Sequence, residues 1–595
     1  MCGIVAHFAY GPSAPAVDRD ELARSNAAMA ARGPDGDGLW ASGDGRVGLA
    51  HRRLAIIDLS DDAAQPMALV ERDLHITYNG EIYNYRQLKS ELESEGRRFV
   101  TDSDTEVILH LYDRDGPEML ERLRGMFALA IWDGRERALF MARDPFGIKP
   151  LYIADDGATL RCASQVKALI AGGKAGHGVD AAGHVGFFMF GHVPEPHTLY
   201  ADIQALEPGS WTRVHAGGRR ESQRYFQVTD ILAETPEAEA PHALRPLLLD
   251  SVRHHLVADV PVGVFLSAGL DAATITALAA ESEGTALKTV TLAFDEFQGS
   301  PGDEAPLAEA IAARYGTDHE TVRIKGESFH EEVTDVLAAM DQPSIDGVNV
   351  YFVAKAAKAR GLKVALSGLG GDEMFMGYDV FGKVPALAAR LGWIPGRQPL
   401  GRILRRAMAP MMGGATSPKW AGVLEYGGDI PGAYLLKRAL MMPWELDQVL
   451  DPDMVRAGLE RLSTLETLGA IAGPVSGARR QIAALEINRY MRSQLLRDAD
   501  WAGMAHSVEI RVPLVDPVLF RALAPMLARP GGPSKQTMAT TPAKQLPEDV
   551  LRRPKTGFTI PVREWLQGAG AGEARDGHGL RGWAREVYAA FTGGP

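Results

Sequence analysis

The pattern of apolar residues changes once along the chain, near residue 216, and this change constrains the fold more than any single motif. Before it, short strand-like runs such as Leu74–Tyr78 and Phe127–Trp132 are broken by Gly, Asp and Asn. Helical patterns such as Thr105–Arg114 lie between these runs. The mixture predicts stacked, mostly antiparallel sheets flanked by helices, an α+β domain over residues 2–215.

Residues 216–240 contain glycines, arginines and an acidic, proline-containing stretch, which predict an exposed linker. After them a strand, a turn and a helix repeat, beginning with Val260–Leu266 and Ala272–Ser282. This alternation predicts an α/β domain over residues 241–566, with a parallel sheet and a mainly helical later part. Ligands bind at the carboxyl ends of such strands.

Glycine and proline mark further boundaries in the second half. They predict loops near Gly392–Gly401 and Gly413–Gly432. Residues 567–595 are rich in Gly and Ala, so a partly mobile C-terminal tail is expected there.

Composition excludes several classes of protein. No stretch approaches the roughly 18 apolar residues of a membrane helix, and the N-terminus does not resemble a secretory signal. Only Cys2 and Cys162 occur, which excludes a disulfide framework and a cysteine-built zinc site. The net charge is −13, a poor basis for binding nucleic acid. We therefore expect a cytoplasmic enzyme without nucleic-acid or membrane partners.

Cys2 directly follows the initiator methionine. Cysteine is small, so the methionine would normally be removed, leaving residue 2 with a free α-amino group. That amine, with a reference pKa of about 8, can accept the thiol proton and activate the sulfur as a nucleophile. A cysteine that stands near the N-terminus by chance explains this single residue about equally well.

Further motifs follow Cys2 in order, and together they resemble the glutaminase domain of class II amidotransferases, the N-terminal-nucleophile type, as far as about Gly209. The motifs are Arg32–Asp35, Ala50–Leu54, Tyr78–Asn84, Ser103–Glu106 and Arg143–Tyr152. The family often has His at the position of Ala31 and Glu at the position of Gln165.

The resemblance implies roles for individual residues. Attack of the Cys2 thiolate on the glutamine amide creates an oxyanion, whose stabilisation falls to the Asn79 side chain and the Gly80 backbone N–H. Arg53 would bind the α-carboxylate of glutamine, and Glu81 with Asp104 its α-ammonium group. The alternatives are a hairpin turn at Asn79–Gly80 and a helix cap at Asp104.

A second chemical centre lies at Val264–Ala273, where a strand gives way to a helix. A turn of small residues there points backbone N–H groups at an anion. With Val364–Glu373 it resembles the phosphate loop of adenylating ATP-pyrophosphatases, which implies ATP as substrate and Mg²⁺. The resemblance implies that phosphates and nucleotide lie at Ser267, Gly269, Ser367 and Gly368, adenine at Leu266 and Leu292, and Mg²⁺ at Asp271 and Asp372.

Later motifs resemble the asparagine synthetases: Leu495–Asp500, Met504–Asp516 and Arg552–Phe558. The resemblance makes Lys555 the candidate for neutralising charge on pyrophosphate and the adenylated carboxyl group, with a surface lysine as the alternative. Glu509 and Arg511 form either a structural ion pair or part of a substrate site. The chain departs from the family at five positions: Gly is usual in place of Ala268 and Met376, Ser in place of Ala272 and Ala273, and several members have Glu in place of Leu369.

The resemblance implies a glutamine-hydrolysing asparagine synthetase with L-glutamine, L-aspartate and ATP as substrates, and it leaves a homodimer open. One alternative is an amide ligase for another carboxylic acid, such as a natural product, a cell-wall precursor or a peptide. A glutamine-binding protein without synthetase activity and a tRNA modifier are further alternatives. The acidic charge and the glutaminase motifs disfavour the tRNA modifier.

Overall fold

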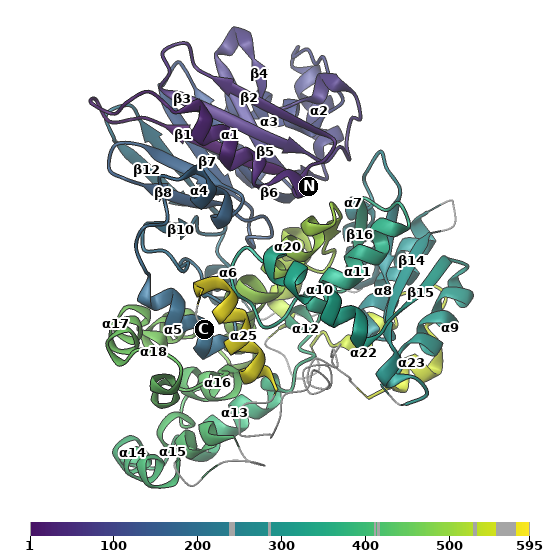
Figure 1. Ribbon diagram of the computed structural model, residues 1–595. Helices are drawn as coiled ribbons and strands as arrows, with labels where there is room; N and C mark the ends of the chain where they lie inside the picture. The colour runs from purple at the N-terminus through teal and green to yellow at the C-terminus, as the bar shows by residue number, and fades with distance from the viewer. Residues whose placement is uncertain are drawn as a thin grey trace.

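The computed structural model describes residues 2–236, 244–283, 287–300, 302–409, 412, 417–527, 532–554 and 579–593, apart from the side chain of Ser328. The chain forms an N-terminal half built on antiparallel sheets and a C-terminal half built on a parallel sheet and many helices (Figure 1). Among these residues, no helix combines the length and the apolar character needed to cross a bilayer.

Two six-stranded antiparallel sheets form the N-terminal half, which confirms the predicted stacked sheets. The first sheet has the order β10-β8-β9-β1-β3-β2 and the second has the order β12-β11-β7-β6-β5-β4. The first consists of β1 (Gly3–Phe8), β2 (Gly36–Ala41), β3 (Val47–Arg53), β8 (Tyr152–Asp155), β9 (Leu160–Ala163) and β10 (Ile203–Ala205). The second consists of β4 (Met67–Leu69), β5 (Leu74–Ile82), β6 (Gly125–Asp133), β7 (Ala138–Arg143), β11 (Ser210–His215) and β12 (Arg220–Arg224).

Strand β6 shows why these sheets stack. All nine of its residues are buried, because successive side chains point to opposite faces and both faces are covered. Phe127, Leu129 and Ile131 pack on the helix side of the sheet. Ala128 and Ala130 face the first sheet, where small side chains let the two sheets approach closely.

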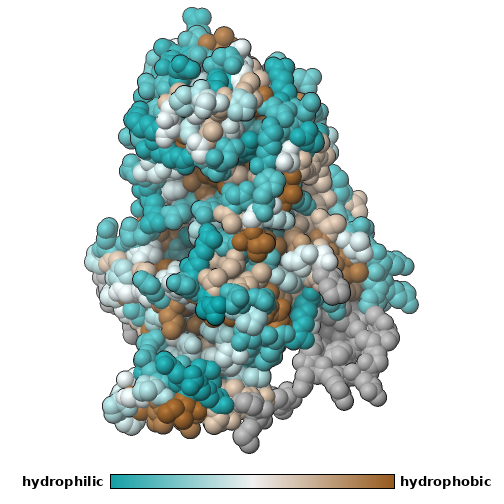
Figure 2. All heavy atoms as spheres, turned by 60° about the vertical axis from the view of Figure 1, so that its left-hand side comes forward, coloured by the Kyte–Doolittle hydropathy of each residue, from teal (hydrophilic) through white to brown (hydrophobic). Residues whose placement is uncertain are grey.

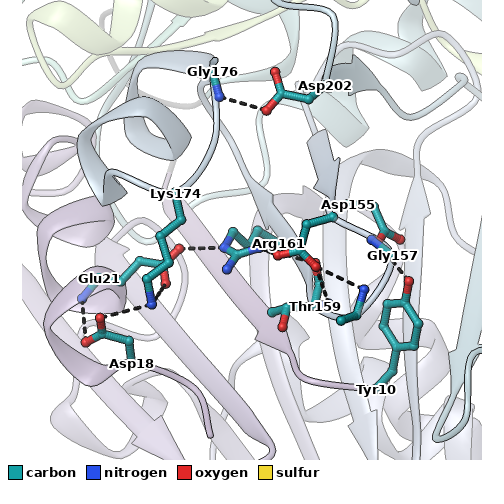
Figure 3. Close-up of polar contacts among 12 residues, drawn as sticks. Tyr10, Asp18, Glu21, Asp155, Gly157, Thr159, Arg161, Lys174, Gly176 and Asp202 are labelled. Carbon is teal, nitrogen blue, oxygen red and sulfur yellow. Dashed lines mark hydrogen bonds and ion pairs between the residues drawn. The ribbon is translucent and has the colours of Figure 1, made fainter. Parts of the chain in front are cut away.

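Helices cover the outer faces of both sheets. They are α1 (Arg19–Ala27), α2 (Tyr85–Ser94), α3 (Asp104–Asp115) and α4 (Val166–Gly172). Helix α5 (Ala181–Phe190) instead packs against α17 (Pro452–Leu462) of the C-terminal half. A polar network holds α1 on the first sheet (Figure 3). Arg161 of β9 donates to the Glu21 carboxylate of α1 at 2.5 Å, and Lys174 pairs with Asp18 at 3.1 Å and with Glu21 at 3.0 Å.

The range 216–240 differs from the exposed linker that the sequence predicts. Strand β12 extends the second sheet, and helix α6 (Val228–Glu234) follows it. The two glycines that suggested a linker, Gly217 and Gly218, have φ of +86° and +90° and form the turn between β11 and β12. Paired glycines are common in both contexts, so the local sequence does not distinguish them.

The C-terminal half contains a five-stranded parallel sheet with the order β15-β14-β13-β16-β17, as predicted for an α/β domain. Its strands are β13 (Val262–Phe265), β14 (Lys288–Phe294), β15 (Asp318–Ile324), β16 (Val364–Leu366) and β17 (Glu509–Arg511). The helices of this part are α7 (Leu244–His255), α8 (Leu270–Ser282), α9 (Ala305–Tyr315), α10 (Gly326–Ala339), α11 (Val348–Ala359) and α12 (Gly371–Met374).

The remaining helices follow, and several of them line the carboxyl edge of this sheet. They are α13 (Val380–Leu391), α14 (Arg397–Met408), α15 (Val423–Tyr426), α16 (Ile430–Arg438), α17 (Pro452–Leu462), α18 (Thr464–Ala472), α19 (Ala478–Leu485), α20 (Arg497–Ala505), α21 (Pro517–Leu523), α22 (Lys535–Ala539), α23 (Glu548–Arg552) and α25 (Leu580–Thr592). A π-helix, Glu486–Leu496, joins α19 to α20.

Three predicted loops or tails are helical instead. Helix α14 begins inside the predicted loop Gly392–Gly401, and α15 and the start of α16 lie inside Gly413–Gly432. In the predicted C-terminal tail, α25 packs Trp583 and Val587 into the core with no exposed surface. Tertiary packing overrides the weak helix propensity of glycine in these segments.

Candidate active sites

The Cys2 sulfur lies at the start of β1, where the two sheets meet the C-terminal half. Its residue is 8% exposed. The backbone nitrogen of Cys2, the atom that would carry the proposed α-amine, donates to Asn79 Oδ1 at 2.9 Å. Burial raises the pKa of the Cys2 thiol, and a backbone hydrogen bond from Leu54 opposes this effect. The nucleophile therefore depends on an adjacent base for activation.

Asn79 and Gly80 lie inside strand β5, paired with Ala128 and Phe127, so the alternative of a hairpin turn is wrong. Asn79 is fully buried, and its Nδ2 has no hydrogen-bond partner among the described residues. A buried amide N–H without a partner is rare, because it loses its hydrogen bonds to water without replacement. At Gly80 a Cβ atom would lie 2.2 Å from the Met126 carbonyl oxygen, so β6 leaves room for glycine alone.

Glu81 points from the same face of β5 as Asn79 and reaches the C-terminal half. Its Oε2 lies 3.5 Å from Nη2 of Arg511, whose Nε donates to Glu509 at 2.6 Å. Burial and the negative Glu509 raise the pKa of Glu81. Burial also acts to raise the pKa of Glu509, but the positive charges around it, including Arg511 and Lys149, lower it to about 2. Glu509 and Arg511 thus form a buried ion pair, and Arg511 also contacts Glu81, which was predicted to bind glutamine.

Asp104 and Arg53 lie apart from this face. Asp104 accepts hydrogen bonds from the Tyr78 hydroxyl at 2.9 Å and from the Ile82 N–H at 3.0 Å. Burial raises the pKa of Asp104 to about 6, although these two bonds act to lower it. The side-chain cap of α3 is Ser103, which accepts from Thr105 N–H. The Arg53 guanidinium donates to the carbonyl groups of Ser60, at 2.7 Å, and Asp58.

Two contacts join the nucleophile to the other half of the molecule, and the sequence motifs did not assign them. Arg32 donates from Nε to the Cys2 carbonyl at 3.0 Å and makes two hydrogen bonds to Asp500 of α20, at 2.7 and 3.0 Å. Arg511, at the end of β17, contacts Glu81 through its side chain, and its carbonyl accepts from the Ser367 N–H at 2.8 Å. Spacing along the chain cannot reveal pairs that lie hundreds of residues apart.

A cavity of about 1410 Å³ opens at the carboxyl edge of the parallel sheet. Every residue that the resemblance assigned to ATP or Mg²⁺ lines it, namely Leu266, Ser267, Gly269, Asp271, Leu292, Ser367, Gly368 and Asp372. The loops after β13 and β16 meet there, since a Cβ atom on Gly368 would lie 2.9 Å from the Ala272 nitrogen. This is the position where an open parallel sheet binds its ligands.

Lys535, at the first position of α22, was not predicted to belong to this site. Its ammonium group lies 2.7 Å from Asp372 Oδ1 and also contacts the Asp271 carboxylate. A lysine in the first turn of a helix opposes the helix dipole, and only the two carboxylates explain its position. The predicted residue Lys555 lies outside the described residues.

The departures from the family pattern differ in their consequences. Ala273 packs into the core with Leu266 and Ala277, away from the cavity. Ala268, Ala272 and Leu369 line the cavity, so a serine hydroxyl at residue 272 or a glutamate carboxylate at residue 369 would have faced the ligand. Met376 has φ of +54°, the left-handed conformation that glycine adopts readily, and its sulfur accepts from Arg479 at 2.8 and 3.0 Å.

Comparisons with known proteins also divide the chain into an N-terminal and a C-terminal part. Residues 1–226 match the family described as glutamine amidotransferase domain, and residues 243–579 match the family described as asparagine synthase. Asparagine synthetase [glutamine-hydrolyzing] 1 of Bacillus subtilis (strain 168) is 34% identical over 95% of this chain and 88% of its own length. A putative asparagine synthetase [glutamine-hydrolyzing] of Mycobacterium bovis has the same identity and coverage. Amidase chry2 of Gibberella zeae is 32% identical over 64% of this chain and 60% of its own.

Proposed function

This chain belongs to the asparagine synthase family of glutamine amidotransferases, whose members use ATP, and we propose that it converts L-aspartate to L-asparagine with nitrogen from L-glutamine. The observation that carries the proposal is the position of Arg511. Its side chain contacts Glu81 beside the nucleophile, and its backbone holds Ser367 at the rim of the ATP cavity. A glutaminase and a ligase that share one residue are suited to passing ammonia between them.

In the N-terminal half, the α-amine of Cys2 takes the thiol proton and the sulfur attacks the side-chain amide of glutamine. Asn79 Nδ2 and the Gly80 N–H donate to the oxyanion that forms. Ammonia leaves, and a γ-glutamyl thioester remains on Cys2. Water then hydrolyses the thioester, which releases glutamate.

In the C-terminal half, a carboxylate oxygen of the acceptor attacks the α-phosphate of ATP, forming an acyl-adenylate and releasing pyrophosphate. Ser267, Gly269, Ser367 and Gly368 line the cavity where the phosphates would lie. Ammonia attacks the acyl carbon and AMP leaves with the bonding electrons, which forms the amide.

Asp271 and Asp372 suit Mg²⁺, because they place two carboxylates around one position that the Lys535 ammonium group already contacts. When bound, the ion would neutralise charge on the phosphates. Lys535 would then turn its ammonium group toward phosphate oxygens, which it can bind as a point charge. Among the described residues, no cluster of three or more His, Cys, Asp or Glu suggests a different metal site.

Two charged residues of the cavity wall support an amino acid as acceptor. Arg489 of the π-helix and Asp346 both line the cavity. Burial lowers the pKa of Arg489 and raises that of Asp346, so both would gain from a ligand of opposite charge. L-Aspartate offers an α-carboxylate to one and an α-ammonium group to the other, while its side-chain carboxylate remains for adenylation.

A larger carboxylic acid is the second candidate acceptor. The cavity of about 1410 Å³ exceeds the roughly 300–1,000 Å³ of common ligand pockets, which leaves room beyond ATP and aspartate. The similarity to a fungal amidase also favours variation in the acceptor among relatives.

The test measures pyrophosphate release with Mg-ATP and glutamine, comparing L-aspartate with a panel of other carboxylic acids. We expect release that depends on L-aspartate, with asparagine formed in equal amount. Asp271→Asn should abolish it, and Cys2→Ala should retain it only when ammonia is added. Cys162→Ala is the matched control, because Cys162 lies buried in β9 and burial raises its pKa to about 12. Release that depends on a different acid, without any on aspartate, would refute asparagine synthesis and favour the second candidate.

A further inference from the structure

Helix α14 packs on α15 along one face. Arg397 and Arg405, two turns apart on one face, pair with Asp429 at 2.8 Å and with Glu425 at 2.6 Å. Between them Gly401 is buried, and a Cβ atom there would lie 2.4 Å from the Glu425 nitrogen. This face therefore packs closely on α15 and cannot rotate outward without losing both ion pairs.

The side of α14 that adjoins this packed face presents apolar side chains to solvent. Leu400 is 48% exposed, Ile403 66%, Leu404 40% and Met408 47%, and Trp393, just before the helix, is 76% exposed. Spacings of three and four residues place the four helical side chains on one side. Figure 2 shows hydrophobic atoms at the foot of the molecule, the end formed by α14 and α15 in Figure 1, bordered by hydrophilic groups. We call these five residues the apolar face.

The segment that carries the apolar face is basic, although the whole chain has a net charge of −13. Residues 390–408 contain no Asp or Glu, and their arginines are 390, 397, 402, 405 and 406. Arg390 and Arg406 are exposed, and neither has an ion-pair partner among the described residues. The positive charge thus flanks exposed apolar side chains in a protein that is otherwise acidic.

Although composition alone predicted no membrane partner, we propose that the apolar face docks this protein on the surface of an anionic lipid bilayer. A helix with Trp, Leu and Ile on one side and Arg beside them is suited to lie in the plane of the membrane interface, without crossing it. Its apolar side chains would enter the acyl boundary, and Arg390 and Arg406 would meet lipid phosphates. The 3₁₀-helix η7 (Pro418–Gly422), which contacts α14, carries Lys419 of the cavity wall, so docking would turn one rim of the cavity toward the lipid.

A second copy of the chain fits this face less well. In a two-fold contact each α14 would meet its own equivalent, which would bring the arginines of two basic segments together without an acidic residue between them. Five apolar side chains also fall short of the roughly 20–30 residues per partner in a stable interface.

The test is co-sedimentation of the full-length protein with vesicles of phosphatidylcholine alone and with vesicles that contain about one third phosphatidylglycerol. We expect binding to the anionic vesicles, weakened at about 0.5 M NaCl because salt screens exposed charges. Ile403→Gln with Leu404→Gln should reduce the affinity at least about tenfold, since each side chain loses its apolar burial. Arg390→Gln with Arg406→Gln should reduce it about 25-fold, roughly fivefold for each arginine.

The matched control is Leu39→Gln with Val70→Gln, two exposed apolar residues of the N-terminal half, which should bind as the wild type does. Glutamine hydrolysis, measured in each variant, confirms that the fold is intact. Equal sedimentation of the wild type and the Ile403/Leu404 variant, or no binding to anionic vesicles, would refute the proposal. A concentration-dependent dimer that the Ile403/Leu404 variant abolishes, without vesicle binding, would assign the face to a second copy instead.

Discussion

At the scale of single residues, Asn79 shows what burial adds to a motif. Its Oδ1 accepts from the Cys2 nitrogen, while its Nδ2 stays without a partner among the described residues. The first contact orients the group that would act as base. The Nδ2 group remains as a donor for the negative charge that would form on the glutamine amide oxygen during the proposed reaction. A fixed donor aimed at charge that develops in the transition state accelerates a reaction.

Asp104 carries a prediction about pH. Its pKa of about 6 means that it is largely protonated at pH 5 and largely ionised at pH 7. If its carboxylate binds the α-ammonium group of glutamine, the dissociation constant should fall about tenfold between these pH values, following the ionised fraction. Calorimetry in a Cys2→Ala background measures this binding without turnover. In Asp104→Asn the dependence should disappear.

The same ionisation affects stability in the opposite direction. The folded-state pKa lies above the ordinary value of 3.8, so native Asp104 keeps a proton that the unfolded chain loses. Its contribution to the free energy of unfolding is therefore full below pH 3.8 and falls as the pH rises to about 6. If the glutamine affinity of the wild type does not change between pH 5 and pH 7, Asp104 does not bind glutamine and only positions Tyr78 and Ile82.

At the scale of secondary-structure elements, the pairing of β5 with β6 holds the proposed oxyanion site in place. Gly80→Ala would place a methyl group 2.2 Å from the Met126 carbonyl oxygen and 2.7 Å from the Phe127 Cα atom. Both are backbone atoms of a buried strand, so the strands must separate. We expect a loss of at least about 2 kcal/mol in the free energy of unfolding and a large loss of glutamine hydrolysis, since Asn79 moves with the strand.

Thermal and denaturant unfolding of the Gly80→Ala variant measure this loss. Gly43→Ala is the control, because a Cβ atom at Gly43 meets no atom within 4 Å. Equal stability of the two variants would mean that β5 and β6 accommodate a side chain at this position and that glycine is not required there.

At the scale of the whole molecule, Arg32 and Asp500 connect the two halves through a buried ion pair with side-chain exposures of 2% and 5%. Removing one partner leaves the other charge buried and unpaired, so Arg32→Leu or Asp500→Leu should cost about 3–5 kcal/mol. Because Arg32 also holds the Cys2 carbonyl, we expect the single variants to form more glutamate per pyrophosphate than the wild type.

The double variant, with leucine at both positions, should recover part of the stability because no unpaired charge remains. Arg456→Leu with Asp453→Leu serves as the control, since that pair is exposed at 75% and 83% and should matter little. A ratio of glutamate to pyrophosphate that stays at the wild-type value in both single variants would contradict the role in coupling.

The fold class was predictable from the sequence because it depends on short-range pattern. Alternating apolar residues predicted the antiparallel sheets, and the repeated strand, turn and helix predicted the parallel sheet. Gly217–Gly218, Gly401 and the segment of α25 were misinterpreted. Glycine-rich sequence suits a linker, a tight hairpin or a close helix contact, and only the neighbouring elements determine which one forms.

The two proposed centres were also predicted from local motifs, in the residues that follow Cys2 and in the loops after β13 and β16. What only the tertiary structure decided is how the centres are joined. Arg32 with Asp500, Glu81 with Arg511, and Lys535 between Asp271 and Asp372 are contacts across long stretches of chain. The physical reason is that a motif reflects the local conformation of one turn or one strand end. A buried charge, in contrast, needs an oppositely charged partner, and that partner can lie anywhere along the chain.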